Sequence, residues 1–267
     1  MKRNIITNAF LSTTLLLLVF GRLNLSGAEH KSDQHAAWNY DGATGPKHWA
    51  ELSGAFHLCK DGKRQSPIDL REKESFTVNG LPIKVSYRPD TVDEINNGHT
   101  IKEIIHNNSK VRYDGREYRL VQFHFHAHSE HTLNGKPFPL EIHFVHQDKT
   151  GHLLVIGVFL KQGKANAALE PVLRHLPRKT GDHEVDSMDE VDLKSFIPKN
   201  SAIFSYDGSL TTPPASEGVR WFVYKKPLTL SAKQLAQFQN IYDHNYRPIQ
   251  PRNGRMVGLF RQRPKKN

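Results

Sequence analysis

The most constraining feature of the sequence is the run LVQFHFHAH at residues 120–128, in which apolar and polar residues alternate. A β-strand turns successive side chains to opposite faces, so a period of two predicts a strand with one face in the core. The even positions share one face: Leu120, Gln122, His124, His126 and His128. The odd positions share the other face, which is apolar: Val121, Phe123, Phe125 and Ala127. The histidine-rich face is then either a solvated surface or the floor of a site.

The rest of the chain favours a mainly β fold. Short β-type runs lie between turn signals at residues 83–88, 100–105, 110–115, 117–128, 140–147, 152–161, 202–209 and 218–230. Helical patterns are few. One covers residues 164–176, and a second, at 231–242, opens with Ser231 and Gln234 in the spacing of a capping box. No repeat or low-complexity linker divides the chain, so we expect a single domain.

The N-terminus has the pattern of a secretory signal peptide. Lys2 and Arg3 precede an apolar stretch to Phe20, and a small-residue site ends at Ala28. The apolar run is short, and nothing downstream resembles a stop-transfer segment. We therefore expect residues 1–28 to be removed and residues 29–267 to form an exported domain, periplasmic or secreted, with no membrane anchor.

Charge and cysteine content limit the binding partners and the disulfides that we expect for this chain. The formal net charge is +10, and loss of Lys2, Arg3 and Arg22 would lower it to +7. The basic residues are scattered apart from a cluster at 261–266, which indicates a solvated basic surface and predicts no nucleic-acid partner. Cys59 is the only cysteine, so no disulfide can form within the chain.

A second alternating run, LEIHFVHQ at residues 140–147, places Glu141, His143 and Val145 on one face. If it pairs antiparallel with the 120–128 strand, His143 lies opposite His124 and His126. Three histidines with an open position are typical of catalytic zinc, whereas structural zinc usually has four protein ligands, commonly cysteines. The sequence therefore favours a three-histidine metal site.

Two polar neighbours strengthen this interpretation. A histidine that binds metal generally donates its other N–H to an acceptor that fixes the tautomer. Gln122 precedes His124 by two residues on the same face, and Glu141 precedes His143 in the same way. Each alone is an ordinary polar strand residue, but together with the three histidines they favour a zinc centre.

The chain resembles the α-class carbonic anhydrases of the exported bacterial type. The segments that carry the resemblance follow one another in the family's order and spacing: WNY, GPKHW, RQSPIDL, NNGHT, QFHFHAHSEH, EIHFVH and DGSLTTPP. It runs from about Trp38 to Arg255 and implies a large twisted, mostly antiparallel central sheet with peripheral helices. The implied activity is reversible hydration of CO2 to bicarbonate and a proton, by attack of zinc-bound hydroxide with histidine-mediated proton shuttling.

The resemblance also implies roles for individual residues. The implied Zn²⁺ ligands are His124, His126 and His143, with Gln122, a main-chain carbonyl near Asn245, and Glu141 as their respective acceptors. The implied catalytic residues are His99 as proton shuttle, Thr211 as gatekeeper and Glu130 as the buried acceptor of Thr211. The implied CO2 pocket consists of Val145, Val155, Leu210, Val219 and Trp221, with Thr212 contacting bicarbonate. The residues expected to order the water chain are Tyr40 and Asn97.

Some features depart from the family or stay open. Many exported bacterial members pair a cysteine near Cys59 with one just after TTPP, but this chain has Ala215 there. We expect a monomer or a homodimer, the latter linked through Cys59 if that thiol is exposed. Three other histidines flank the expected ligands, His128, His131 and His146, and the first two are expected to have hydrogen-bonding or packing roles. The alternative functions are a noncatalytic relative that binds zinc or a surface partner, and a zinc hydrolase that acts on esters.

Overall fold

A mixed β-sheet organises the part of the chain that this computed structural model describes, residues 36–185 and 189–261. The expected signal peptide, residues 1–28, lies outside it. The strands are β1 (Asp69–Leu70), β2 (Phe76–Asn79), β3 (Ile83–Ser86), β4 (Val92–Asn96), β5 (Ile101–Ile105), β6 (Lys110–Tyr113), β7 (Arg116–His126), β8 (Thr132–Leu133), β9 (Leu140–Gln147), β10 (Leu153–Gln162), β11 (His183–Val185), β12 (Ile203–Ser209), β13 (Glu217–Leu230) and β14 (Gly258–Arg261).

The helices are short. The α-helices are α1 (Trp49–Leu52), α2 (Leu58–Asp61), α3 (Glu170–Arg174) and α4 (Ala232–Gln239). The 3₁₀ turns are η2 (Gly42–Thr44), η3 (Gly54–Phe56), η4 (Glu72–Glu74), η5 (Ala167–Leu169) and η6 (Leu193–Phe196). None of the helices in the described residues is long and apolar enough to cross a membrane.

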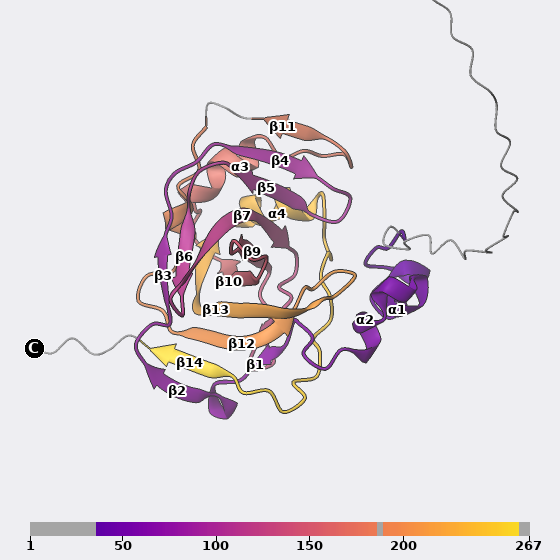
Figure 1. The fold of residues 1–267 in the computed structure, drawn as a ribbon. Coiled ribbons are helices and arrows are strands. Elements are labelled where there is room, and N and C mark those ends of the chain that lie inside the picture. The colour runs from indigo at the N-terminus through magenta and orange to yellow at the C-terminus, as the bar shows by residue number, and fades with distance from the viewer. Residues whose placement is uncertain (1–35, 186–188, 262–267) are drawn as a thin grey trace, which may run out of the picture. The chain divides into compact units, whose positions relative to one another are not determined.

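The sheet runs in the order β11-β4-β5-β7-β9-β10-β13-β12-β14-β2, with β3 and β6 attached beside β7. Figure 1 shows β9 and β10 in the middle of this order, with β4, β5 and β11 on one side and β12, β14 and β2 on the other. Within this sheet the pairs β10–β13 and β14–β2 are parallel, and the other pairs are antiparallel. The expectation of a mainly β fold with a mostly antiparallel central sheet is confirmed.

Both faces of the central strands are covered. On β9, Leu140, Ile142 and Phe144 pack into one hydrophobic cluster, while Val145 packs against a second cluster on the other face. Strand β10 divides its apolar side chains between the same two clusters, so apolar side chains pack on both faces of the middle of the sheet. Rigid central strands of this kind are a suitable platform for functional side chains. The described residues all belong to one compact unit, which agrees with a single domain.

The predicted elements are largely found, with shifted ends. Strand β9 covers the predicted residues, and α4 begins with the predicted capping box between Ser231 and Gln234. The predicted helix at 164–176 is shorter, because η5 and α3 together cover only residues 167–174. The short helices between residues 49 and 61 were not predicted, since their stretch reads as irregular.

One predicted detail of β7 is wrong. Leu120 was expected on the histidine face and Val121 on the apolar face, but Leu120 is fully buried in the core and Val121 is 41% exposed. The cause is a shift in the pairing of β7 with β9 between Leu120 and Gln122. Such a bulge inserts one residue and reverses the faces on one side of it. The alternation holds from Gln122 to His126, which is the part that carries the histidines.

Candidate metal centre

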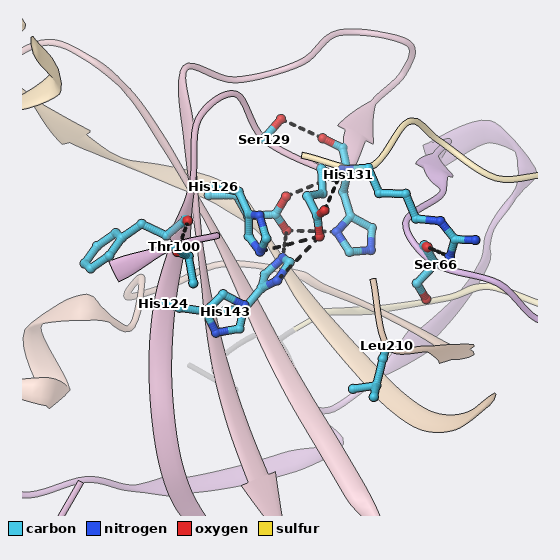
Figure 2. Close-up of polar contacts among 12 residues, drawn as sticks. Ser66, Thr100, His124, His126, Ser129, His131, His143 and Leu210 are labelled. Atoms are coloured by element: carbon cyan, nitrogen blue, oxygen red, sulfur yellow. Dashed lines mark hydrogen bonds and ion pairs between the residues drawn. The ribbon is translucent and has the colours of Figure 1, made fainter. Parts of the chain in front are cut away.

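Three histidines meet on neighbouring strands in the middle of the sheet. His124 on β7 is paired directly with His143 on β9, and His126 follows two residues along β7 on the same face. Their ring centroids lie 4.6 to 5.4 Å apart, and one nitrogen from each lies within 4.8 Å of the others. Figure 2 shows the three rings gathered around one point. The expected placement of His143 opposite His124 is confirmed.

Hydrogen bonds fix the orientation of two of these rings. His124 Nδ1 donates to Gln122 Oε1 at 2.8 Å, and His126 Nδ1 donates to the main-chain oxygen of Asn245 at 2.7 Å. Because neutral imidazole carries one proton, a donor at Nδ1 leaves a lone pair on Nε2. The Nε2 atoms of His124 and His126 are therefore free to bind a metal.

The third ring is held by an acid. His143 Nε2 lies 3.1 Å from Glu141 Oε1, without full hydrogen-bond alignment, and this leaves Nδ1 as the metal-binding nitrogen. Burial raises the pKa of the Glu141 carboxyl, but its interactions with His131 and His143 outweigh burial and lower the pKa overall. An ionised Glu141 is the acceptor that a metal-binding histidine requires on its far side.

The buried polar atoms at this point fit a cation. His126 Nε2 has no hydrogen-bond partner among the described residues, and its nearest acid is Glu130 Oε2 at 3.6 Å. Burial, followed by the other histidines of the cluster, lowers the pKa of His124 well below 6.5, and burial also lowers the pKa of His126. Both imidazoles are therefore neutral at pH 7. Three imidazoles that meet at one point suit zinc.

The neighbouring histidines lie elsewhere. His131 Nδ1 bonds to Glu141 Oε1 at 2.8 Å and its Nε2 bonds to the Tyr206 hydroxyl at 2.6 Å, so neither nitrogen is spare. His128 is exposed beyond the end of β7, against the ring of Tyr246. Figure 2 shows His131 to one side, away from the point where the three rings meet.

A cavity of about 160 Å³ opens above the three histidines. Four of the expected apolar pocket residues line it: Val145, Val155, Leu210 and Trp221. Figure 2 shows Leu210 across from the histidines. Val219 does not line the cavity. Val219 is 1% exposed and packs in the core with Val155 and Trp221, because it lies two residues before Trp221 on the same face of β13. Four of the five residues expected in the pocket thus line this cavity.

Thr211 and Thr212 line the same cavity, next to Leu210. Glu130 lies underneath, where its Oε1 accepts from the main-chain N–H of Arg247 at 2.8 Å. Its Oε2 is buried with no hydrogen-bond partner in the described residues, so the expected bond from Thr211 is not formed at this oxygen. That bond stays a prediction.

His99 lies at the rim of the cavity, together with Tyr40 and Asn97. Its ring stacks on Trp38, with centroids 3.6 Å apart and planes 6° apart. Partial burial lowers the pKa of His99 below 6.5. The stacking explains why Trp38, in the WNY segment, belongs to the site, although no role was predicted for it.

Two further cavity residues were missed by the sequence analysis. Thr100 and Lys102 line the cavity from the start of β5. Thr100 donates from its hydroxyl to the main-chain oxygen of Phe125 at 2.7 Å, which ties β5 to β7 beside the histidines. The alternation of TIKEII could have indicated that Lys102 shares the face of His124, once β5 was paired with β7.

Comparison with known proteins identifies the class of protein to which this chain belongs. The family model of the eukaryotic-type carbonic anhydrases matches residues 44–260. A carbonic anhydrase from Pectobacterium carotovorum is 40% identical over 221 residues, which cover 82% of this chain and 89% of that protein. An α-carbonic anhydrase from Thermovibrio ammonificans, solved with the inhibitor sulfanilamide, superposes with a TM-score of 0.81 at 45% identity, covering 84% of this chain and 99% of that one.

A dioscorin complexed with ascorbate also shares the fold, with a TM-score of 0.78 at 29% identity over 86% of this chain and all of that one. The chain belongs to the eukaryotic-type, or α-class, carbonic anhydrase family. It is accordingly an enzyme, a carbonic anhydrase, and the reaction of that family is the hydration of carbon dioxide.

Proposed function

We propose that this chain catalyses the zinc-dependent, reversible hydration of CO2 to bicarbonate and a proton, with a histidine carrying the proton. The observation that carries the proposal is the convergence of three imidazoles beside an apolar wall. His124, His126 and His143 would hold the zinc. When bound, zinc supplies water with a pKa lowered to about 7, an effect well established for carbonic anhydrases.

The apolar wall would position the substrate. CO2 carries no charge and little polarity, so contact with apolar side chains is the main way to hold it. Val145 pairs with Val155, and Val155 pairs with Trp221, which places these three side chains in adjacent strands beside His143. Bicarbonate is charged and would leave such a wall readily.

Thr211 and Glu130 would orient the reacting water. An ionised carboxylate can only accept hydrogen bonds, so a threonine hydroxyl that donates to Glu130 must use its own oxygen as an acceptor toward the cavity. That arrangement selects one orientation of the water before reaction. A preorganised contact of this kind is a common source of rate enhancement.

His99 would accept the proton and pass it to buffer. Imidazole titrates near neutral pH, so it takes up and releases protons in both directions. Its place at the rim, stacked on Trp38, would put it between the cavity and solvent. Tyr40 and Asn97 border the same space and would order the intervening water.

Stopped-flow CO2 hydration by the purified mature protein, with zinc measured on the same sample, tests the proposal. We expect one zinc per chain and hydration far above the buffer rate, lost on chelation and restored by zinc. Stoichiometric zinc with no hydration would instead favour a noncatalytic zinc-binding relative. Hydrolysis of an aryl ester without CO2 hydration would favour an esterase.

Export and assembly complete the proposal. Residues 1–28 would act as a signal peptide, which mass spectrometry of the exported protein tests through a mature N-terminus at Glu29. Cys59 is half-buried, and burial raises the pKa of its thiol. A nonreducing gel of oxidised protein decides between a monomer and a Cys59-linked dimer.

A further inference from the structure

Lys102 brings a positive charge into the cavity. It is paired with His124 across β5 and β7, and it lines the cavity on the polar side, opposite the apolar wall. It is half-buried. The remaining lining residues include no other lysine or arginine and no acid.

The ammonium of Lys102 has no acid to balance it. Within residues 36–185 and 189–261, no carboxylate oxygen lies within 4.0 Å of it and it makes no side-chain hydrogen bond. Other lysines on the same sheet are paired, such as Lys110 with Glu117 at 2.9 Å and Lys225 with Glu72 at 2.6 Å. Lys102 therefore has its charge available for a ligand in the cavity.

A second donor points to the same ligand. Gln122 is the diagonal neighbour of Lys102 on the β5–β7 pair, since it pairs with Ile104. Its Oε1 accepts from His124, so its amide nitrogen is left as a donor, and that nitrogen bonds to no acceptor in the described part of the chain. An ammonium and an amide N–H on diagonal neighbours that line one cavity are complementary to one anionic oxygen.

The electrostatics of the cavity favour an anion at this place. Lys102 is paired with His124 across β5 and β7 and lines the same cavity, so its charge lies on the face that carries the three histidines. A bound zinc ion would add two further positive charges nearby. Low-dielectric walls such as Val145 and Val155 concentrate such a field, and an anion between the cations relieves their repulsion.

We propose that Lys102, with the amide of Gln122, forms a subsite for small monoanions on the polar wall, with bicarbonate as its natural ligand. The inference rests on the proposed function, since bicarbonate is the charged partner of that reaction. Uncharged CO2 gains nothing from Lys102, so the subsite separates the two partners of the reaction by charge. The same subsite would make the enzyme sensitive to other small anions.

The test compares Lys102→Gln with Lys102→Arg and with the wild type, all loaded with zinc at constant ionic strength. Lys84→Gln is the matched control, because Lys84 is exposed on β3, outside the cavity. The probe is thiocyanate, followed in two ways: inhibition of CO2 hydration, and the thiocyanate-dependent rise in Tm, which needs no turnover. Bicarbonate is then tested as an inhibitor of hydration.

We expect Lys102→Gln to weaken the binding of thiocyanate and bicarbonate roughly three- to tenfold in both readouts. A half-exposed charge contributes at most about that much to the affinity for an anion. Lys102→Arg should stay within about twofold of the wild type, and Lys84→Gln should not change. Unchanged dissociation constants in Lys102→Gln would overturn the subsite and leave the anions on the metal alone. The zinc content and hydration rate of the wild type test the proposed function separately. Failure of the subsite can therefore be distinguished from failure of the proposed function.

Discussion

His143 and His146 lie three residues apart on β9, both almost fully buried, and they differ in what their nitrogens contact. His146 faces the core, where its Nε2 lies 2.7 Å from the Tyr87 hydroxyl and its Nδ1 bonds to the main-chain oxygen of Leu154 at 3.1 Å. His143 faces the cavity, and its Nδ1 has only Glu130 Oε2 at 3.8 Å. The two side chains share a strand and a degree of burial but not a function.

The comparison teaches that a buried histidine indicates a metal site only when a nitrogen remains unused. At His146 both nitrogens are satisfied, which is the ordinary state of a buried polar group. At the His124, His126 and His143 cluster, each ring has an acceptor at one nitrogen and a vacant lone pair at the other, and the lone pairs converge. Convergence, not the number of histidines, identifies the centre.

The largest expected effect comes from replacing each of these two histidines in turn. His143→Ala should lose most of its zinc and at least roughly 10³-fold in kcat/KM, because a site with two imidazoles holds zinc weakly. His146→Ala should keep zinc stoichiometry and most activity, at a cost in stability of about 1–3 kcal/mol for the unpaired Tyr87 hydroxyl. Zinc analysis and stopped-flow CO2 hydration are measured on both variants. Full zinc content in His143→Ala would contradict the assignment of His143 as a metal ligand.

Thr211→Ala should have the next largest effect. We expect zinc to stay bound while kcat/KM falls by on the order of 10²-fold, because the reacting water loses the hydroxyl that orients it. Thr211→Ser keeps the hydroxyl and is the matched control, which should recover most of the loss. Equal rates for Thr211→Ala and the wild type, with zinc present, would show that SLTTPP has no such role.

His99→Ala should lower kcat by roughly tenfold or more in dilute buffer and leave kcat/KM nearly unchanged. A group of pKa near 7 that releases its proton to bulk water is limited to about 10³ s⁻¹, whereas turnover in this family reaches about 10⁶ s⁻¹. Added imidazole should restore the rate. His128→Ala is the control, since His128 is exposed beyond the cavity. A parallel fall in kcat/KM without rescue would exclude His99 as the shuttle.

The smallest expected effect on turnover, but a clear one on stability, comes from titrating His146. Burial lowers the pKa of His146 from 6.5 to about 4, so the folded protein holds it neutral. Its contribution to the free energy of unfolding, about 3 kcal/mol, is present above pH 6.5. This contribution declines as the pH falls from 6.5 and is lost below about 4.

Urea unfolding at pH 7, 5.5 and 4 measures this loss against His146→Gln, which does not titrate. The wild type should lose about 3 kcal/mol more than the variant over this range, on top of losses common to both. Parallel pH profiles would show that His146 is not held neutral by its core position.

Much of the centre was predictable because period-two alternation and strand pairing are local rules. From Gln122 to His126 and from Leu140 to Gln147, the pattern placed each side chain on the face that the structure gives it. The prediction failed at Leu120 and Val121, where a bulge reverses the faces, since the position of a bulge depends on how β7 packs on β9.

Other features depend on tertiary contacts that no local pattern carries. Glu94 and Glu103 face each other across β4 and β5 and are almost fully buried, although glutamate in a strand normally indicates a solvent face. The stacking of His99 on Trp38 joins residues 61 positions apart, and Val219 is buried in the core with Trp221 instead of lining the cavity. Each of these required the folded chain.

Zinc K-edge X-ray absorption on the loaded wild-type protein tests the central claim most directly. Three convergent imidazoles predict a spectrum with three histidine ligands, with zinc–nitrogen distances near 2.0–2.1 Å and no sulfur. The same measurement on His146→Ala should be unchanged. A sulfur ligand from Cys59, a fourth histidine, or fewer than three histidines would contradict the assignment of His124, His126 and His143 as an open metal centre.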